Sequence, residues 1–171
     1  MSITPDGFNS VIWKPGDPVE KIGFSFVSWI TPEIAISSYD MASSDEVLRI
    51  EGIRTVVSIG GLQAHPGDPS IVHEGFPFVE DGVGNNSDQD LIWALKAIHN
   101  GVSRGKTLIH CAAGISRSPG LVTLYLAMTR GLLWDTALTI VRKGRPQTNI
   151  HILVEEQLKR CLADFPEGPF S

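Results

Sequence analysis

The chain has 171 residues, with 14 Lys and Arg against 19 Asp and Glu and a formal net charge of -5. A chain of this length is typical of one domain and can bury a core that needs no disulfide or metal to support it. The negative net charge argues against broad electrostatic attraction to nucleic acid or anionic lipid, although it allows a local basic pocket.

The two cysteines, Cys111 and Cys161, are too few and too far apart to indicate a disulfide framework, and neither belongs to a CxxC pair or a zinc-like cluster. This usage favours a reducing, intracellular setting. The amino terminus lacks the basic and apolar stretches of a signal peptide, and no uncharged apolar run approaches the roughly 20 residues that span a bilayer. We expect a soluble, cytoplasmic protein that does not bind membranes.

Residues 1–21 are rich in Pro and Gly and lack periodicity, which predicts an irregular leading segment. The patterns that follow predict, in chain order, strands at 23–30 and 33–37, a helix at 43–52, strands at 55–60 and 76–80, a helix at 87–101, a strand at 107–111, and helices at 118–131, 134–144 and 151–165. We place one domain at residues 22–165 and expect the closing tail, residues 166–171, to be frayed.

Capping signals mark the starts of two helices. Ser43 or Ser44 would cap the first, and a capping box from Ser87 to Asp90 would open the second. Strands interleaved with helices predict a single α/β domain with a central, twisted, mostly parallel sheet of about five strands flanked by helices. Ligands of such sheets bind beyond the carboxyl ends of the strands.

The strand at 107–111 runs into the sequence HCAAGISRSPG, residues 110–120, and then directly into a helix. Backbone N–H groups of the intervening loop can point inward, and the positive end of the helix adds to them. The loop residues are Ala112, Ala113, Gly114, Ile115 and Ser116. Gly114 permits the tight turn, so this segment predicts a main-chain cradle for a phosphate dianion.

Cys111 and Arg117 stand at the two ends of this loop. The loop dipoles and Arg117 would lower the pKa of the Cys111 thiol and make a thiolate nucleophile available near neutral pH. The planar guanidinium of Arg117 suits two phosphate oxygens in both the ground state and the transition state. A core cysteine is the simpler interpretation of Cys111 alone, but its neighbours favour the phosphate-binding one.

The loop resembles the HCxxGxxR signature of the protein tyrosine phosphatase superfamily, and more closely that of the dual-specificity phosphatases. Cys111, Gly114 and Arg117 occupy the signature positions. The opening strands and first helix, and the last two helices with the Arg-Pro turn between them, are also similar, so the resemblance covers roughly residues 22–165.

The resemblance implies a general acid aspartate upstream of the signature, and Asp81, 30 residues before Cys111, matches it best. Asp81 would protonate the leaving oxygen and later act as base toward water. Glu80 is a rival carboxylate. Asp88 and Asp90 are rivals too, although favourable charges at a helix start explain both.

Ser118 matches the family hydroxyl that hydrogen-bonds the departing thiolate, and it could also cap the helix that begins nearby. His110 could be a core histidine; in the family this residue orders the loop and tunes the thiolate without entering the chemistry. We interpret Arg142 and Arg145 as solvated charges near a helix end, and Cys161 as a packing residue.

Three alternatives to a phosphatase of this family stay open. A rhodanese-type sulfurtransferase also places a cysteine in an anion-binding loop. Low-molecular-weight phosphatases and arsenate reductases share a CxxxxxR loop, but theirs opens near the amino terminus. A non-catalytic module that recognises a phosphorylated partner needs fewer groups than an enzyme does.

The variable loop positions carry no charge, unlike the lysine-bearing loops of phosphoinositide phosphatases. The default substrate is therefore a phosphorylated protein, on tyrosine, serine or threonine, or a small phosphomonoester. No cofactor or metal is expected, because the thiolate, Arg117 and the loop amides supply the chemistry, and the negative net charge argues against a nucleic acid partner. The sequence does not indicate an oligomeric state.

Overall fold

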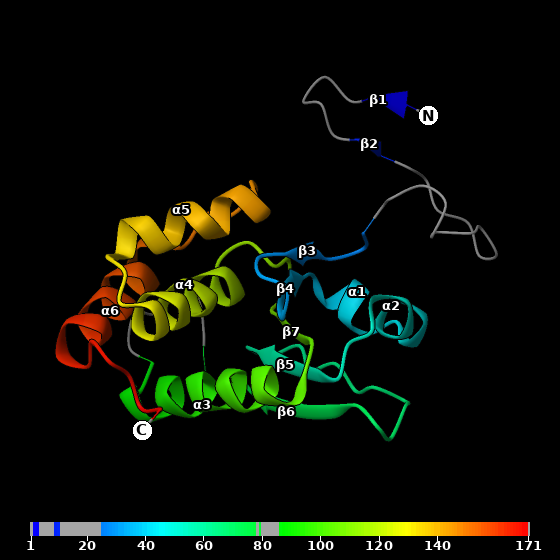
Figure 1. Ribbon diagram of the computed structural model, residues 1–171, viewed down its shortest axis with the longest axis horizontal. Helices are drawn as coiled ribbons and strands as arrows, with labels where there is room; N and C mark the ends of the chain where they lie inside the picture. The colour runs from blue at the N-terminus through cyan, green and yellow to red at the C-terminus, as the bar shows by residue number, and fades with distance from the viewer. Residues whose placement is uncertain (1, 4–8, 11–24, 78, 80–85, 171) are drawn as a thin grey trace.

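The computed structural model describes residues 2–3, 9–10, 25–77, 79 and 86–170. A five-stranded sheet with the order β3-β4-β7-β5-β6 runs through the described part of the chain (Figure 1). Its strands are β3 (Ser28–Trp29), β4 (Ile34–Ser37), β5 (Thr55–Ile59), β6 (Val72–Phe76) and β7 (Thr107–His110). Only the β3–β4 pair is antiparallel among these neighbours, so the predicted single domain with a mostly parallel α/β sheet is confirmed.

Six helices are present in the described residues. They are α1 (Tyr39–Ala42), α2 (Asp45–Glu51), α3 (Asp88–Arg104), α4 (Arg117–Arg130), α5 (Trp134–Gly144) and α6 (Ile152–Asp164). Helices α1 and α2 lie on one side of the sheet, α3 and α4 cover the other, and α5 and α6 pack on the outside of α4 (Figure 1). The sheet is thus buried between two helical layers.

The central strands alternate between the two cores that these layers create. On β5, Val56 belongs to the cluster under α2, whereas Val57 belongs to the cluster under α3 and α4. On β7, Leu108 and Ile109 divide between the two clusters in the same way. Because both faces are covered, these strands read as continuous apolar runs rather than as alternating patterns. The short run at 107–111 is therefore a central strand, and the loop after it lies in the middle of the sheet edge.

The edge strands differ from the prediction. The strand expected at 76–80 is instead β6 at Val72–Phe76, while residues 78 and 80 lie outside the described chain. Its sequence VHEGF carries one glycine and two polar residues, and its side chains are partly exposed because it forms the sheet edge. Of the described residues in the strand expected at 23–30, only Ser28 and Trp29 pair in the sheet, as β3.

The helix starts follow the capping signals. Ser44, not Ser43, caps α2, since its Oγ accepts a hydrogen bond of 3.3 Å from the Val47 N–H. Ser87 caps α3 by accepting from the Asp90 N–H at 3.0 Å, and its hydroxyl donates to the Asp90 carboxylate at 2.6 Å. The predicted cap is therefore confirmed, with the carboxylate bound to the serine hydroxyl.

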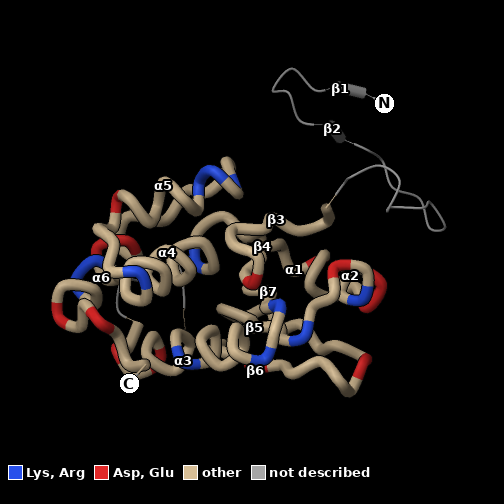
Figure 2. Tube along the Cα trace, viewed as in Figure 1, with Lys and Arg blue, Asp and Glu red and all other residues tan. Residues whose placement is uncertain are grey.

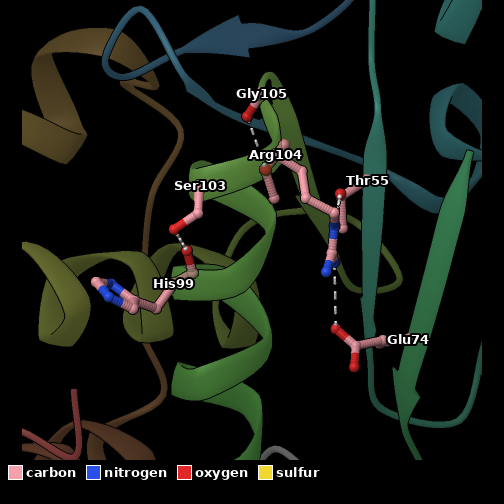
Figure 3. Close-up of polar contacts among 7 residues, drawn as sticks. Thr55, Glu74, His99, Ser103, Arg104 and Gly105 are labelled. Carbon is pink, nitrogen blue, oxygen red and sulfur yellow. Dashed lines mark hydrogen bonds and ion pairs between the residues drawn. The ribbon is translucent and has the colours of Figure 1, made fainter. Parts of the chain in front are cut away.

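Arg104, the last residue of α3, contacts the first residue of β5 and the middle residue of β6. Its Nε donates to Thr55 Oγ1 at 3.3 Å, and its Nη2 lies 3.8 Å from the Glu74 carboxylate (Figure 3). Both charged side chains are about 40% exposed, so their ion pair adds little stability. These contacts link the carboxyl end of α3 to β5 and β6.

Both ends of the chain contain described residues outside the sheet and its helices, although residues 4–8 and 11–24 lie outside the described chain. Within the leading segment, β1 (Ser2–Ile3) pairs antiparallel with β2 (Asn9–Ser10). At the other end, the Phe170 ring packs 4.7 Å from the His99 ring and 5.5 Å from the Tyr125 ring, between centroids. An aromatic side chain near the end of the chain can thus hold a short polar tail against the helices.

Candidate active site

The predicted loop lies at the carboxyl end of β7, the middle strand of the sheet, and α4 begins at Arg117. A pocket of about 480 Å³ opens there. The described residues that line it are Cys111, Ala112, Ala113, Ile115, Ser116, Arg117, Asn149, Ile150, His151 and Ile152. The structure therefore brings the signature residues together with a second segment, residues 149–152, that the sequence did not single out.

Cys111 is buried, with 2% of its surface exposed, and its Sγ lies 3.2 Å from the Ser118 Oγ. Burial alone would raise the pKa of this thiol. The hydroxyl and N–H of Ser118, the charge of Arg117 and the N–H of Gly114 outweigh burial, so the pKa of Cys111 lies below its ordinary value. The lowered pKa favours the thiolate, which is the nucleophilic form of cysteine.

Gly114 adopts a left-handed backbone conformation with a φ of +68°. A Cβ at this position would lie 2.5 Å from the Ser37 carbonyl oxygen and 2.7 Å from Arg145 Nη2. Two constraints therefore require glycine here: the turn of the loop, and its close approach to the end of β4.

Arg117 reaches from the first turn of α4 toward the end of β5. Its Nε is buried and has no hydrogen-bond partner in the described part of the chain. A Cβ at Gly60, whose φ is +91°, would overlap Arg117 Nη1, so this glycine makes room for the guanidinium. A buried cationic N–H without a partner is costly, and a phosphate oxygen in the pocket would satisfy it. Sequence reasoning missed Gly60, although a glycine directly after a buried strand was the available signal.

Arg145 is buried, so its interpretation as a solvated charge is wrong. Basic residues gather at the carboxyl end of α5 (Figure 2); Arg142 and Lys143 are exposed there, whereas Arg145 is 7% exposed. Arg145 Nε donates to the Gly114 carbonyl at 2.5 Å, and Nη2 donates to the Ala113 carbonyl at 3.2 Å. A guanidinium behind the loop thus holds two of its carbonyls outward, which leaves the N–H groups free to face the pocket.

Arg145 also joins the loop to the sheet edge. Its Nη1 donates to Ser28 Oγ at 2.9 Å, on β3. The nearby Cys111 thiolate favours the charged guanidinium, while burial lowers its pKa and is the larger effect. Because its partners lie 31, 32 and 117 residues away, no local pattern could have indicated this role.

His110 is fully buried and forms hydrogen bonds at both ring nitrogens. Its Nδ1 lies 2.9 Å from the Cys111 carbonyl, and its Nε2 lies 2.6 Å from Ser58 Oγ. A carbonyl can only accept, so Nδ1 carries the hydrogen, and Ser58 donates to the bare Nε2 of the neutral ring. Burial is the main cause that lowers the pKa of His110, which favours this neutral form.

Ser58 also binds His73 Nε2 at 2.9 Å and accepts from the Ala64 N–H at 3.1 Å. Since its one hydrogen goes to His110, the bond from His73 requires that Nε2 of His73 carry a hydrogen. Sequence reasoning found His110 but missed Ser58 and His73, because neither lies near the loop in the chain. The arrangement places His110 behind the nucleophile rather than in the pocket.

The two loop serines take different places. Ser118 is fully buried beside Cys111 in the first turn of α4, while Ser116 stands at the N-cap position and its Oγ accepts from the His151 N–H at 2.9 Å. Ser118 therefore does not cap α4. The remaining loop residues, Ala112, Ala113 and Ile115, line the pocket without adding charge.

Asp81, the expected general acid, and its rival Glu80 lie outside the described residues. Asp88 and Asp90 occupy the first turn of α3, where Asp90 binds the capping Ser87. Helix capping thus accounts for Asp90 without any part in catalysis.

In the described part of the chain, no group of three or more His, Cys, Asp or Glu residues could hold a metal ion. Among the same residues, no helix has the length and apolar character that a membrane span requires.

Comparison with known proteins identifies the architecture. Residues 36–165 match the family described as dual specificity phosphatase, catalytic domain. The chain belongs to this family. The matched range takes in the loop from Cys111 to Arg117.

Three relatives illustrate the likeness. The chain is 30% identical over 148 residues to protein-tyrosine-phosphatase IBR5 of Arabidopsis thaliana, covering 85% of this chain and 53% of that protein. It is 29% identical to human dual specificity protein phosphatase 22, covering 76% and 70%. A crystal structure of a substituted form of human DUSP28 superposes with a TM-score of 0.75 at 25% identity, covering 82% and 96%. The chain thus spans about half the length of the first of these relatives.

Proposed function

We propose that this chain hydrolyses phosphate esters on tyrosine, serine and threonine residues of proteins through a cysteinyl-phosphate intermediate. One observation carries the proposal. The Cys111 thiol, whose pKa is lowered, lines the same pocket as Arg117, whose buried Nε has no partner among the described residues. Together these groups supply a nucleophile and an unsatisfied cationic donor for a phosphate.

In the first step the Cys111 thiolate attacks phosphorus, and a sulfur–phosphorus bond forms as the bond to the leaving oxygen breaks. Arg117 and the inward N–H groups of the loop stabilise the charge on the three remaining phosphate oxygens. Asp81 donates its proton to the leaving oxygen. In the second step Asp81 accepts a proton from water, which attacks phosphorus and releases the thiolate.

Ser118 contributes to the second step. Its hydroxyl lies 3.2 Å from Cys111 Sγ and can donate a hydrogen bond to the sulfur as negative charge returns to it. The neutral His110 ring holds the Cys111 carbonyl, which fixes the backbone at the entrance of the loop. We further propose a reducing location such as the cytoplasm, because a cysteine whose pKa is lowered is readily oxidised elsewhere.

The test is hydrolysis of p-nitrophenyl phosphate against pH, in the presence of a chelator, by the unaltered chain and its Cys111→Ser, Asp81→Asn and Cys161→Ala variants. Cys111→Ser is expected to abolish turnover, and Cys161→Ala to leave it unchanged. Activity should rise as the pH rises through the pKa of Cys111 and fall again as Asp81 loses its proton. Asp81→Asn should lose about 100-fold in rate together with this alkaline fall.

Chelator-resistant turnover that disappears only with Cys111 supports the proposal. Absence of turnover in the reduced, unaltered chain contradicts it. Tight phosphopeptide binding without turnover would then indicate a recognition module, and a persulfide on Cys111 would indicate a sulfurtransferase.

A further inference from the structure

The outer wall of the pocket is built from two segments that are hydrogen-bonded to each other. Ile115 belongs to the phosphate-binding loop, whereas residues 149–151 belong to the connection between α5 and α6, and Ile152 begins α6. The Asn149 N–H donates to the Ile115 carbonyl at 2.8 Å, and the His151 N–H donates to Ser116 Oγ at 2.9 Å. These bonds join the connecting segment to the loop, so the two segments form one continuous wall.

The wall exposes apolar side chains beside the phosphate site. Ile152 is 65% exposed and Ile115 is 36% exposed, and both line the pocket. Apolar surface in contact with water is unfavourable, so covering these isoleucine side chains with an apolar group lowers the free energy. Two such side chains at the mouth of one pocket form a patch that a ligand can bury.

Charge is confined to the bottom of the pocket. Of the described lining residues, Arg117 is the only one with a permanent positive charge, and none is acidic. A substrate residue next to the phosphorylated one would find no side chain of opposite charge among the wall residues. If that substrate residue is charged, contact with the isoleucines removes its water and costs free energy.

His151 adds a polar contact to the same wall. Its Nδ1 accepts a hydrogen bond of 3.2 Å from the Leu153 N–H, as the cap of α6. The neutral ring consequently carries its hydrogen on Nε2. This N–H can donate to a main-chain carbonyl of a bound peptide, a group that every sequence provides, so it would orient the peptide without selecting its charge.

We propose that Ile115 and Ile152 form a subsite that selects phosphorylated segments with an uncharged, apolar side chain next to the phosphorylated residue. The subsite rests on the proposed function, because it describes the substrates of the same pocket. A leucine neighbour gains contact with the isoleucines, while lysine or glutamate loses hydration there. A preference of about tenfold in kcat/KM is expected for leucine over either charged residue.

The experiment uses three phosphotyrosine peptides that differ only in the residues on both sides of the phosphotyrosine: leucine, lysine or glutamate. Their kcat/KM values are divided by that for p-nitrophenyl phosphate, which has no neighbouring residue. Ile152→Glu should reduce the leucine preference to about twofold or less and raise the relative rate for the lysine peptide. Ile152 is exposed at the first turn of α6, so this substitution has little effect on folding.

The matched control is Leu133→Glu, which introduces the same charge at a side chain that is 78% exposed and absent from the pocket lining. It should keep the full leucine preference. Equal relative rates for the three peptides in the unaltered chain would overturn the subsite, as would a preference that survives Ile152→Glu.

A binding measurement separates the subsite from the proposed function. Dissociation constants of the three peptides for Cys111→Ser, which cannot turn over, should follow the same order as the rates. If the unaltered chain does not hydrolyse p-nitrophenyl phosphate but the dissociation constants keep the expected order, the phosphatase mechanism is contradicted and the subsite is supported. Equal dissociation constants would overturn the subsite whether or not the chain is an enzyme.

Discussion

Both cysteines of this chain are buried, but they occupy opposite chemical environments. Cys111 is 2% exposed and Cys161 is 4% exposed. The pKa of Cys111 is lowered, whereas burial, aided by Asp88 and Asp164, raises the pKa of Cys161 to about 11. Burial therefore does not decide whether a thiol is reactive; the donors and charges directed at the sulfur do.

The surroundings of each cysteine explain the difference. Cys111 lies between a strand end and a helix start, where N–H groups and Arg117 are directed at it. Cys161 lies within α6 and lines an apolar cavity of about 230 Å³. The other described residues around that cavity are Ile92, Leu95, Met128, Phe165, Gly168 and Pro169. No cationic side chain lines the cavity in this described set, so the thiol of Cys161 remains protonated.

The largest expected effect is on alkylation by iodoacetamide at pH 7. A thiol whose pKa is about 11 is ionised in about one molecule in ten thousand, against a few per cent for an ordinary thiol. Cys111 should therefore react at least about 100-fold faster than Cys161, as measured by mass spectrometry of the modified peptides. Inorganic phosphate should slow only the reaction of Cys111.

In urea-denatured protein the two rates should converge, since both thiols then have ordinary surroundings. Comparable rates in the folded protein would contradict the assigned environments.

The features that the sequence predicted are those encoded by neighbouring residues. The loop from Cys111 to Arg117 is one continuous segment between a strand and a helix, and the capping of α3 by Ser87 likewise depends on residues three apart. The central strands were predictable because burial on both faces demands apolar runs.

The features that the sequence did not predict depend on distant contacts. Arg145 lies at a helix end, where arginines are usually solvated, and only the fold places the loop carbonyls beside it. The strand β6 was displaced in the prediction because edge positions do not require an apolar pattern. Residues 149–152 become part of the pocket only when α6 packs against α4, which no local signal reveals.

A smaller effect is expected from Arg145→Met, which removes the guanidinium that holds the loop carbonyls. Loss of buried, charge-assisted hydrogen bonds should lower kcat/KM by about 10- to 100-fold. If Arg145 positions the loop, the pH at which Cys111 becomes reactive toward iodoacetamide should also move upward, toward the behaviour of Cys161. Arg145→Lys should recover only part of the loss, because an ammonium cannot reproduce the forked donors.

Arg142→Met is the matched control, since Arg142 is exposed on the same helix end. It should change neither the rate nor the pH dependence of alkylation. An Arg145→Met variant that loses stability but keeps the reactivity of Cys111 would show that Arg145 supports the fold and not the thiolate.

The smallest expected effect concerns stability in alkaline solution and the Cys161→Ala variant. The folded state holds the Cys161 proton more tightly than the unfolded state, so its contribution to stability is fully present below pH 9 and is lost as the pH rises through about 11. Cys161→Ala should cost about 1 kcal/mol at neutral pH, because it enlarges the apolar cavity, but the stability of this variant should fall less steeply above pH 9.

The pH dependence of stability due to Cys111 has the opposite sign. Its lowered pKa gives stability that is present above the ordinary thiol pKa and lost as the pH falls through the folded value. Cys111→Ser should therefore leave the alkaline fall due to Cys161 in place. Urea unfolding of both variants between pH 7 and 10.5 measures the two slopes, and identical slopes in the two variants would contradict the separation between the cysteines.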